Sequence, residues 1–420
     1  MESVVYDLIV VGAGAAGMMA AGVAASRGLQ VALLDSNEKC GKKVYITGKG
    51  RCNITNDVDA QDFLNFVVSN PKFIYSAIHN FTPYDTMDFF ESRGLSLEIQ
   101  RGGRVFPCSN KASDVTSVLT KEAKRNGVAI FLQQKVETII VHPKDTQARF
   151  LVRAKDHFYG NNVLLATGGL SYPSTGSDGS GYQLAKNLGH TIIQPKSALV
   201  ALEFEQNVTS LMGLSLRNIG LTITYQNKPI HQLFGELVFT NKGASGPIML
   251  STSSLINRLD LQQVKLSFDL KPALSQEKLD ERILRDWDKQ KNKVFANSLD
   301  DLLPQKIIPY IVQNTPIQPY TRVHSITKQQ RNHLVQLLKN LVFTPSRLGD
   351  IAVGIVTAGG VDTRQIDPKT MQSKLIQGLY FAGEIIDIDA VTGGYNIQMS
   401  FSTGNLAGKK VEKYSTLAPQ

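Results

Sequence analysis

Short apolar runs and a helix of small residues alternate at the start of the chain. Residues 6–11 read Tyr-Asp-Leu-Ile-Val-Val, which suits a buried parallel strand. Residues 18–27 are rich in Ala and Met and lack proline, so they predict a helix, and Gly28 stands where a left-handed C-cap belongs. Residues 29–34 predict a second buried strand that ends at Asp35. The pattern indicates a βαβ unit of an α/β fold.

Three glycines separate the first strand from its helix, at the spacing Gly12-x-Gly14-x-x-Gly17. Gly12 allows the tight turn, Gly14 lets a pyrophosphate approach the backbone, and Gly17 lets the helix pack closely on the sheet. The helix start then offers N–H groups to phosphates, and Asp35 can accept hydrogen bonds from a ribose. The sequence therefore predicts a dinucleotide site here rather than a glycine-rich turn without a ligand. The expected contacts in this segment are Gly12, Gly14, Ala15, Ala16, Gly17 and Asp35.

The α/β pattern continues to about residue 190. An amphipathic helical region at 60–95 is interrupted at Pro71 and Pro83, and a helix at 112–126 ends before Gly127. A further helix ends near Gly189. Strands are expected at 128–131, 136–141, 150–152 and 162–166.

From about 191 the pattern changes, and it changes back near 350. Short alternating runs within 196–270 predict antiparallel strands, which we expect to form a barrel. Residues 243–255 predict a helix within this region. Residues 275–342 predict helices. Strands at 351–356 and 379–384 and a helix at about 399–410 then restore the α/β pattern. We therefore expect one discontinuous domain, 1–190 plus 350–420, and an inserted domain, 191–349, with a β-barrel at about 191–270 and a helical part at about 275–342.

The return of small-residue strands about 340 residues after the fingerprint indicates FAD. A nicotinamide dehydrogenase completes its cofactor site early, whereas the flavin end of FAD lies far from its adenosine end and needs further binding elements. A strand that ends at Gly383 and Glu384 can direct a carboxylate to a ribityl hydroxyl. The helix start at 393–397 can donate N–H groups to the flavin N1/O2 edge, where they would stabilise the negative charge of a reduced flavin.

Two further segments are candidates for the same cofactor. Residues 36–56 form a glycine-rich polar stretch with five cations, which can wrap an anionic ligand or lie on the surface. Residues 162–166 run into small residues suited to pass beneath a cofactor. The expected contacts outside the fingerprint are Lys42, Lys43, Gly48, Arg51, Cys52, Asn53, Val136, Ala166, Thr167, Gly168, Gly383, Glu384, Gly394, Tyr395, Asn396 and Ile397.

No catalytic acid or base is assigned. Arg51 could hold an anionic substrate, and Cys52, without a Cys-x-x-Cys partner, favours a buried small residue over a redox thiol. Tyr172 and Tyr395 could donate protons or pack against the flavin. The acids at 387 and 389 favour a structural or ribityl-binding role. The seven histidines show no metal-ligand spacing, so no metal is expected.

Composition places the chain among ordinary globular proteins, with 42% hydrophobic and 19% charged residues. The net charge is +9, yet no run of basic residues appears, so nucleic acid is not the favoured partner. Three cysteines fit a reducing cytosol, and the N-terminal run is a strand with a fingerprint rather than a signal peptide. We expect a cytoplasmic protein without a membrane partner; the sequence does not define its oligomeric state.

Seven motifs are spread over nearly the whole chain: Gly12-x-Gly14-x-x-Gly17, Gly48-x-Gly50-Arg51-Cys52-Asn53-x-Thr55-Asn56, Ala166-Thr167-Gly168-Gly169, Tyr172-Pro173-x-x-Gly176, Thr357-x-Gly359-Gly360-Val361, Gly383-Glu384-x-x-Asp387-x-Asp389 and Gly394-Tyr395-Asn396-x-Gln398. With these motifs the chain resembles a bacterial FAD-dependent family that includes aminoacetone-oxidase-like enzymes and flavoproteins linked to bile-acid dehydroxylation. The resemblance implies a discontinuous Rossmann-like FAD-binding domain with an inserted β-barrel and a small helical subdomain.

The leading functional hypothesis is an FAD-dependent oxidoreductase of a small molecule, whose flavin is reduced by NAD(P)H or by an amine-type substrate. Glycines at 176–181 do not follow an apolar strand, so a second dinucleotide domain is not expected. Two alternatives stay open: an RNA-modifying flavoenzyme, which the net charge motivates, and a non-catalytic FAD-binding regulatory protein.

Overall fold

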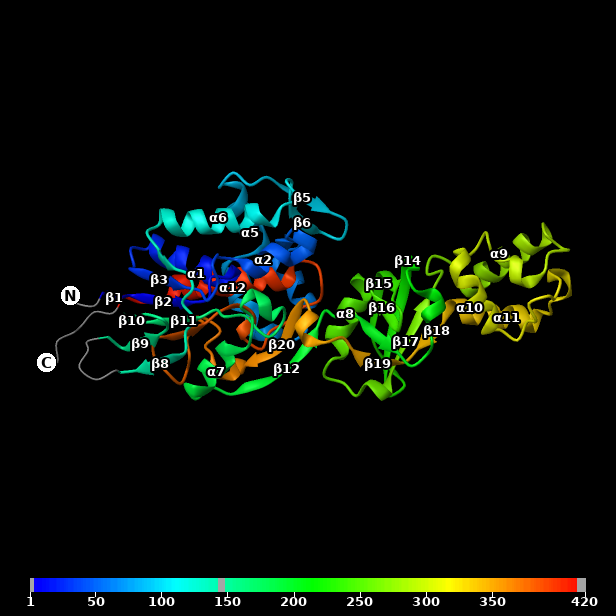
Figure 1. Ribbon diagram of the computed structural model, residues 1–420. Helices are drawn as coiled ribbons and strands as arrows, with labels where there is room; N and C mark the ends of the chain where they lie inside the picture. The colour runs from blue at the N-terminus through cyan, green and yellow to red at the C-terminus, as the bar shows by residue number, and fades with distance from the viewer. Residues whose placement is uncertain (1–3, 143–147, 414–420) are drawn as a thin grey trace. The chain divides into compact units, whose positions relative to one another are not determined.

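The chain divides into two compact units (Figure 1). In this computed structural model residues 4–142 and 148–413 are described, so residues 1–3, 143–147 and 414–420 of the expected 1–190 plus 350–420 domain lie outside the description. One unit comprises Met1–Ala198 with Asp350–Gln420, and the other is Leu199–Gly349. The second unit begins at Leu199 rather than at 191, because the intervening residues pair with a strand of the first unit.

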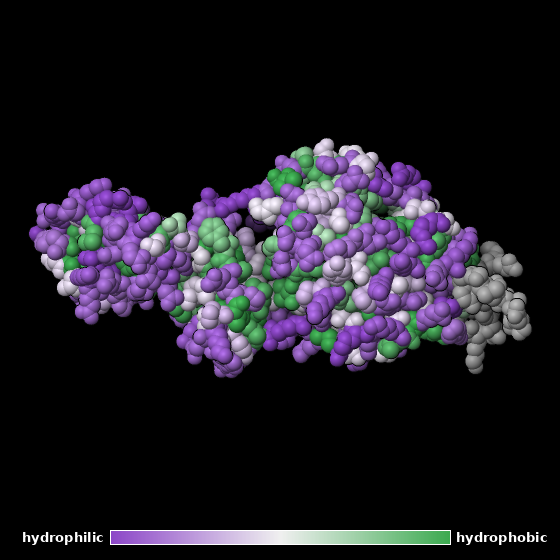
Figure 2. Space-filling model, turned by 180° about the vertical axis from the view of Figure 1, so that it is seen from behind, coloured by the Kyte–Doolittle hydropathy of each residue, from purple (hydrophilic) through white to green (hydrophobic). Residues whose placement is uncertain are grey.

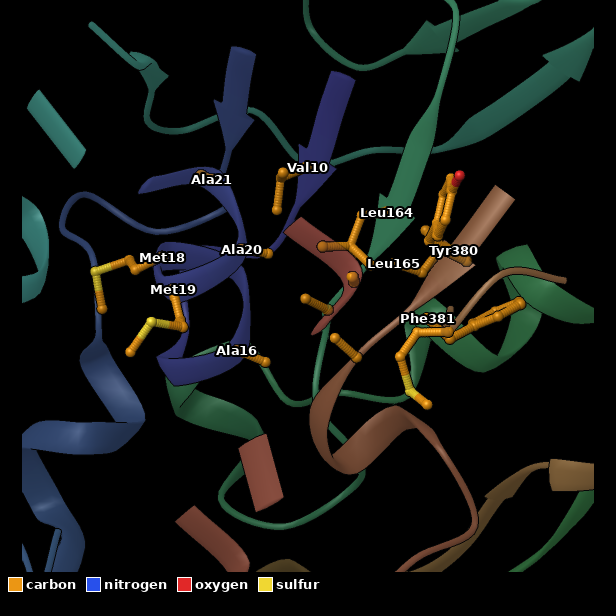
Figure 3. Close-up of a cluster of buried hydrophobic side chains, with 14 of the residues drawn as sticks. Val10, Ala16, Met18, Met19, Ala20, Ala21, Leu164, Leu165, Tyr380 and Phe381 are labelled. Atoms are coloured by element: carbon orange, nitrogen blue, oxygen red, sulfur yellow. The ribbon is translucent and has the colours of Figure 1, made fainter. Parts of the chain in front are cut away.

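A five-stranded parallel sheet lies at the centre of the first unit, in the order β21-β11-β2-β3-β7. Leu164 of β11 pairs with Val10 of β2 on one side and with Tyr380 of β21 on the other, so these three residues lie in one row across the sheet. Their side chains form a continuous buried core with those of the first helix (Figure 3). The strands are β2 (Leu8–Val11), β3 (Val31–Leu34), β7 (Ala129–Phe131), β11 (Val163–Leu165) and β21 (Leu379–Phe381).

Helices α1 (Ala15–Ser26) and α12 (Tyr395–Lys410) pack against each other beside this sheet, and Figure 1 shows them adjacent. Gly404 lies against Ala16 and Gly408 against Ala20, so positions advance together along both helices and the helices run parallel. The remaining helices of this unit are α2 (Lys42–Ile46), α3 (Ala60–Phe63), α4 (Pro71–Asn80), α5 (Pro83–Glu91), α6 (Ala112–Arg125) and α7 (Ser180–Asn187).

Several expected boundaries are confirmed and others shift. Pro71 and Pro83 start helices, where the missing N–H has no partner to lose, and Gly28 and Gly127 follow helix ends with positive φ. The run at 6–11 is split, because Tyr6 belongs to a second sheet. That sheet has the order β1 (Val5–Tyr6), β10 (His157–Gly160), β9 (Phe150–Arg153) and β8 (Thr138–Val141). A third sheet has the order β4 (Thr55–Asn56), β6 (Arg104–Pro107) and β5 (Leu97–Gln100).

The expected strand at 351–356 is wrong. Residues Ile351–Val353 form a 3-10 turn, capped by the Asp350 carboxylate at the N–H of Ala352. The strand β20 is Val356–Val361, buried throughout and paired antiparallel with β12 (Ile192–Ala198). Gly359 and Gly360 therefore lie inside a strand.

Seven strands of the second unit form one antiparallel sheet in the order β18-β17-β14-β15-β16-β13-β19. Its end strands β18 and β19 pair with β17 and β13, and not with each other, within the fully described range 199–349. The strands are β13 (Leu202–Phe204), β14 (Ser215–Tyr225), β15 (Lys228–Phe239), β16 (Gly243–Ser245), β17 (Val264–Asp269), β18 (Leu341–Phe343) and β19 (Pro345–Leu348).

The helices of this unit are α8 (Pro247–Ile256), α9 (Gln276–Asp288), α10 (Ile308–Gln313) and α11 (Lys328–Lys339). Helix α8 packs against β15 and α11 against β17, whereas α9 packs against α11. The helix expected at 243–255 starts late, because residues 243–245 pair with β13 and β15 as a strand. Strand β15 was not predicted, because residues 228–232 are exposed on both faces and show no hydrophobic alternation.

Candidate FAD-binding site

Four segments meet at the carboxyl edge of the central sheet. Because all five strands are parallel, the residues that follow them lie on one side: Gly12 after β2, Asp35 after β3, Ala166 after β11 and Gly383 after β21. The chain leaves β2 toward β3 on one side and later adds β11 on the other, which makes β2/β11 a topological switch point. Open α/β sheets bind ligands at such a point.

The three fingerprint glycines have distinct surroundings. Gly12 has φ +103°, and a Cβ there would lie 2.5 Å from the carbonyl oxygen of Ala166. A Cβ on Gly17 would overlap the carbonyl oxygen of Gly12. A Cβ on Gly14, in contrast, would meet nothing within 4 Å. The first and third glycines are thus required by the fold itself, whereas Gly14 faces open space at an uncapped helix start, which fits a pyrophosphate.

Asp35 holds the neighbouring turn. Its Oδ2 accepts the N–H of Ala13 at 2.7 Å, and its Oδ1 accepts the N–H of Asn37 at 2.8 Å. The Asp35 carbonyl accepts the N–H of Gln134 at 2.8 Å, which brings the segment that contains the buried Val136 to this strand end. Oδ1 also accepts the side-chain amide of Asn37 at 2.9 Å, so Oδ2 is the oxygen with a second lone pair, which keeps the ribose role expected for Asp35 compatible with its role in the turn.

A second cradle forms where the loop at 48–56 meets the start of α12. Gly394 has φ +98°, and a Cβ there would lie 3.0 Å from Asn53 Oδ1. The first hydrogen bond of the helix runs from the Gln398 N–H to the Gly394 carbonyl, and no side chain of the described chain caps the preceding N–H groups. Asn53 Oδ1 is itself buried without a partner among the described residues. An unused acceptor beside three unused donors suits the polar edge of a flavin ring.

The remaining small residues of the expected site shape its walls. Gly48 has φ +57°, and a Cβ there would lie 3.1 Å from the backbone nitrogen of Asn53. Gly168 has φ +75°, and a Cβ there would lie against the hydroxyl of Ser177. Thr167 Oγ1 lies against Gly181 and has no hydrogen-bond partner among the described residues. Ala15, Ala16 and Ile397 lie in the first turns of α1 and α12.

Lys43 and Glu384, both expected to contact the cofactor, form a partly buried ion pair with each other. Lys43 Nζ lies 2.6 Å from Glu384 Oε2 and 2.5 Å from Ser171 Oγ. Glu384 Oε1 accepts the Ser171 hydroxyl at 2.9 Å and the Thr357 N–H at 2.9 Å. The pair therefore ties four separate segments together. Ser171 and Thr357 were not among the expected site residues; their adjacency to Tyr172-Pro173 and to Gly359-Gly360 was the available signal.

Three other expected contacts also have protein partners. Arg51 donates from Nε to Asn110 Oδ1 at 2.5 Å and stacks its guanidinium 4.2 Å from the Phe106 ring centroid. Lys42 pairs with Glu38 at 3.3 Å on the surface. The Asn396 amide exchanges hydrogen bonds with Ala390 at 2.9 and 2.8 Å. Each side chain has a structural partner, so the expected anion-binding role of Arg51 gains no support from its geometry.

Burial decides the chemistry of two further candidates. Cys52 is fully buried, and burial raises the pKa of its thiol to about 12, so it stays protonated. Tyr395 stacks on Phe66 with ring centroids 4.4 Å apart, and burial raises its pKa above the ordinary value. Both are packing residues. Asp389 accepts the Ser69 hydroxyl and Asp387 accepts the Asn70 amide at 3.1 Å, which are structural roles.

The described part of the chain contains neither a metal-binding cluster nor a membrane-spanning helix. Within residues 4–142 and 148–413, no three His, Cys, Asp or Glu side chains are grouped to hold a metal ion. No helix in the same ranges combines the length and apolar character that a bilayer crossing requires. On the face shown in Figure 2, hydrophobic residues form small groups within a mainly hydrophilic surface.

Comparison with known proteins finds relatives that match this chain over nearly its whole length. The chain is 30% identical to ribosomal RNA dihydrouridine synthase of Haemophilus influenzae, over 94% of this chain and 96% of the relative. It is also 30% identical to 3-dehydro-bile acid delta(4,6)-reductase of Clostridium scindens, over 95% of this chain and 97% of the relative.

The fold of a solved dehydrogenase is similar as well. The 3-ketosteroid-delta4-(5alpha)-dehydrogenase of Rhodococcus jostii RHA1 has a TM-score of 0.53 and 14% identity, over 98% of both chains. The family described as HI0933-like protein Rossmann domain matches residues 6–410. The chain therefore belongs to the HI0933-like family of FAD-binding Rossmann proteins and is an FAD-dependent oxidoreductase.

Proposed function

We propose that this flavoprotein adds hydrogen across a carbon–carbon double bond conjugated to a carbonyl group, with NAD(P)H as the source of electrons. The observation that carries the proposal is the uncapped start of α12 beside Asn53, whose N–H groups suit a ring that gains negative charge on reduction. Bound FAD supplies a two-electron carrier that accepts a hydride from one partner and delivers it to the other.

The relatives support the reaction class. A dihydrouridine synthase saturates the uracil double bond, which is conjugated to a ring carbonyl, and a 3-dehydro-bile acid delta(4,6)-reductase saturates double bonds conjugated to a 3-oxo group. Both reactions need a hydride at one carbon and a proton at its neighbour. Two relatives of equal identity thus share one chemistry on different substrates.

Separate segments of this chain are proposed to bind the two ends of FAD. We assign the pyrophosphate to the start of α1 at Gly14 and the ribose of the adenosine to Asp35. We assign the flavin edge to Asn53 and the first turn of α12. Since α1 and α12 run parallel, both positive helix ends point toward the same side of the molecule.

Tyr172 is the proposed proton donor. It has φ +52°, a strained conformation for a residue with a side chain, and it lies next to Ser171 in the network around Lys43. Its backbone is fixed by a hydrogen bond from its N–H to the Ala352 carbonyl. Tyr395, the other tyrosine considered, is buried in an aromatic stack and cannot reach a substrate.

Anaerobic stopped-flow spectroscopy tests the proposal. NAD(P)H should bleach the flavin, and a 3-oxo-Δ4 steroid or a uracil derivative should restore its colour. Tyr172→Phe should leave bleaching unchanged and slow recolouring by about 100-fold. The control Tyr75→Phe, on the exposed face of α4, should change neither step. If no conjugated carbonyl compound recolours the parent flavin, the proposed reaction is wrong.

The electron donor NAD(P)H should bind at the same position as the substrate. The described residues contain one strand–glycine–helix fingerprint, and α7, which follows the glycines at 176–179, is preceded by a 3-10 turn rather than a strand. We therefore expect weak discrimination between NADH and NADPH and a ping-pong pattern of initial rates. A ternary complex of nicotinamide and substrate would contradict this.

The first candidate substrate is a small molecule. A second candidate, uracil in RNA, is favoured by the distribution of charge. Residues 199–349 contain 18 Lys and Arg against 12 Asp and Glu, which gives +6 of the total +9. A relative that acts on ribosomal RNA and an inserted unit that carries most of the positive charge point to the same substrate.

A further inference from the structure

The sheet of the second unit buries one face and leaves the other open. In β14, residues Leu216, Ile219, Leu221 and Ile223 are buried, while the alternate residues Thr222 and Thr224 remain accessible. The buried set packs into a core with the helices of residues 199–349. The open face is formed by the other set, together with the side chains level with it on β15, β17 and β18.

Hydrogen-bonded register defines this open face. Val342, Ser267, Thr222 and Gln232 form one row across four neighbouring strands. In the next row Phe234 lies opposite Gly220, which has no side chain to cover the ring. Phe234 is consequently 63% exposed. The face thus offers an aromatic ring in the middle of hydroxyl and amide groups.

Exposed cations lie on the strands of this face. Arg217 lies on β14, and Lys265 on β17 lies opposite Thr224; both are exposed, and neither has an ion-pair partner among the described residues. Two carboxylates lie on the same strands. Asp269 is neutralised by Lys339 at 2.5 Å, and Glu236 is exposed. The face is therefore net basic.

We propose that this open face, centred on Phe234, binds single-stranded RNA by base stacking on the ring and by contacts of Arg217 and Lys265 with phosphates. An exposed aromatic on a sheet with flanking cations is the arrangement that single strands use, since every base presents a stacking surface and every phosphate a charge. The inference rests on the RNA candidate of the proposed function and supplies the surface that would hold that substrate.

Fluorescence anisotropy of the FAD-loaded protein with a labelled oligouridylate of about 12 nucleotides tests the face. Phe234→Ala should weaken binding about tenfold. Tyr320→Ala is the matched control, because Tyr320 is the most exposed aromatic of the unit at 86% and lies outside the sheet. It should bind as the parent does. Equal affinities of Phe234→Ala and the parent would overturn the proposal, as would absence of parental binding at physiological salt.

Charge variants give a second, independent readout. Arg217→Ala and Lys265→Ala should each reduce the slope of log affinity against log salt by about 0.7, whereas Lys289→Ala on the helical side should not. All variants should keep the flavin spectrum and the rate of bleaching by NAD(P)H, which excludes misfolding. Dihydrouridine analysis of the bound RNA separates the proposed reaction from the proposed surface. RNA that binds at Phe234 but contains no dihydrouridine would refute RNA reduction and leave the binding surface intact. A salt dependence of binding that is unchanged in Arg217→Ala and Lys265→Ala would refute the binding surface.

Discussion

Gly404 of α12 and Ala16 of α1 approach so closely that a Cβ on Gly404 would lie well inside the 3.0 Å limit of real Cβ contacts with the Ala16 carbonyl oxygen. One turn later a Cβ on Gly408 would lie 2.6 Å from the Ala20 carbonyl oxygen. Backbone rather than side chains thus sets the separation of the two helices whose N-termini form the proposed FAD site.

Gly404→Ala should therefore destabilise the protein by about 2 kcal/mol and reduce its FAD content, because rigid backbone must move to admit one methyl group. Gly22→Ala is the matched control. Gly22 is also helical, but a Cβ there would have its nearest neighbours at 3.9 Å, so this change should be neutral or stabilise by up to about 1 kcal/mol. Urea unfolding measures both, and equal stabilities would contradict the packing.

Gly14→Val should purify folded but colourless. Nothing surrounds the position of the added side chain in the protein, so the change should fill only the proposed pyrophosphate site. Circular dichroism should match that of the parent apoprotein. Added FAD at about a hundredfold excess over Kd should stabilise the parent by about 2.7 kcal/mol and leave the variant unchanged. A yellow variant with stoichiometric FAD would show that the fingerprint assignment is wrong.

Lys43→Met and Glu384→Gln should each cost about 2–3 kcal/mol, since each leaves a partly buried partner without its ion pair. The double variant should cost less than the sum of the two, because neither charge is then left alone. Urea unfolding of the three apoproteins measures this coupling. Strict additivity would mean that the Lys43–Glu384 contact contributes nothing to stability.

Cys52 should make the stability depend on alkaline pH. Burial raises the folded-state pKa to about 12, above the ordinary 9.0 expected in the unfolded chain. Its contribution is therefore complete below pH 9 and is lost as pH rises from 9 toward 12, by about 1.4 kcal/mol at about pH 10. Cys52→Ser should remove this part of the slope, whereas Cys108→Ser, at an exposed thiol, should not. Identical pH slopes in all three proteins would refute the buried thiol.

The discontinuous domain predicts the outcome of two deletions. Replacement of residues 199–349 by a short flexible linker should leave a fragment that binds FAD weakly, since the proposed contacts all lie in Met1–Ala198 and Asp350–Gln420. Removal of 350–420 should abolish binding, because Gly383, Glu384 and the start of α12 are then gone. Flavin titration by fluorescence quenching checks both, and a C-terminal truncation that keeps FAD would contradict the assignment.

Local pattern determined much of this protein. The fingerprint from Gly12 to Gly17, the strand that ends at Asp35 and the glycines that follow helices at 28 and 127 are readable because turn geometry, capping and period depend on neighbouring residues. The return of small-residue segments near 380 was enough to indicate FAD, and family membership confirms that cofactor.

Tertiary structure alone decided how distant groups are used. Lys43 and Glu384 are 341 residues apart, and only the fold shows that they form an ion pair with each other. Residues 356–361 became a strand because β12 supplies its hydrogen-bonding partner, and β15 formed without apolar alternation because β14 pairs with it. Sequence period reports the burial of single residues, whereas the pairing of strands and charges depends on which segments the chain topology brings together.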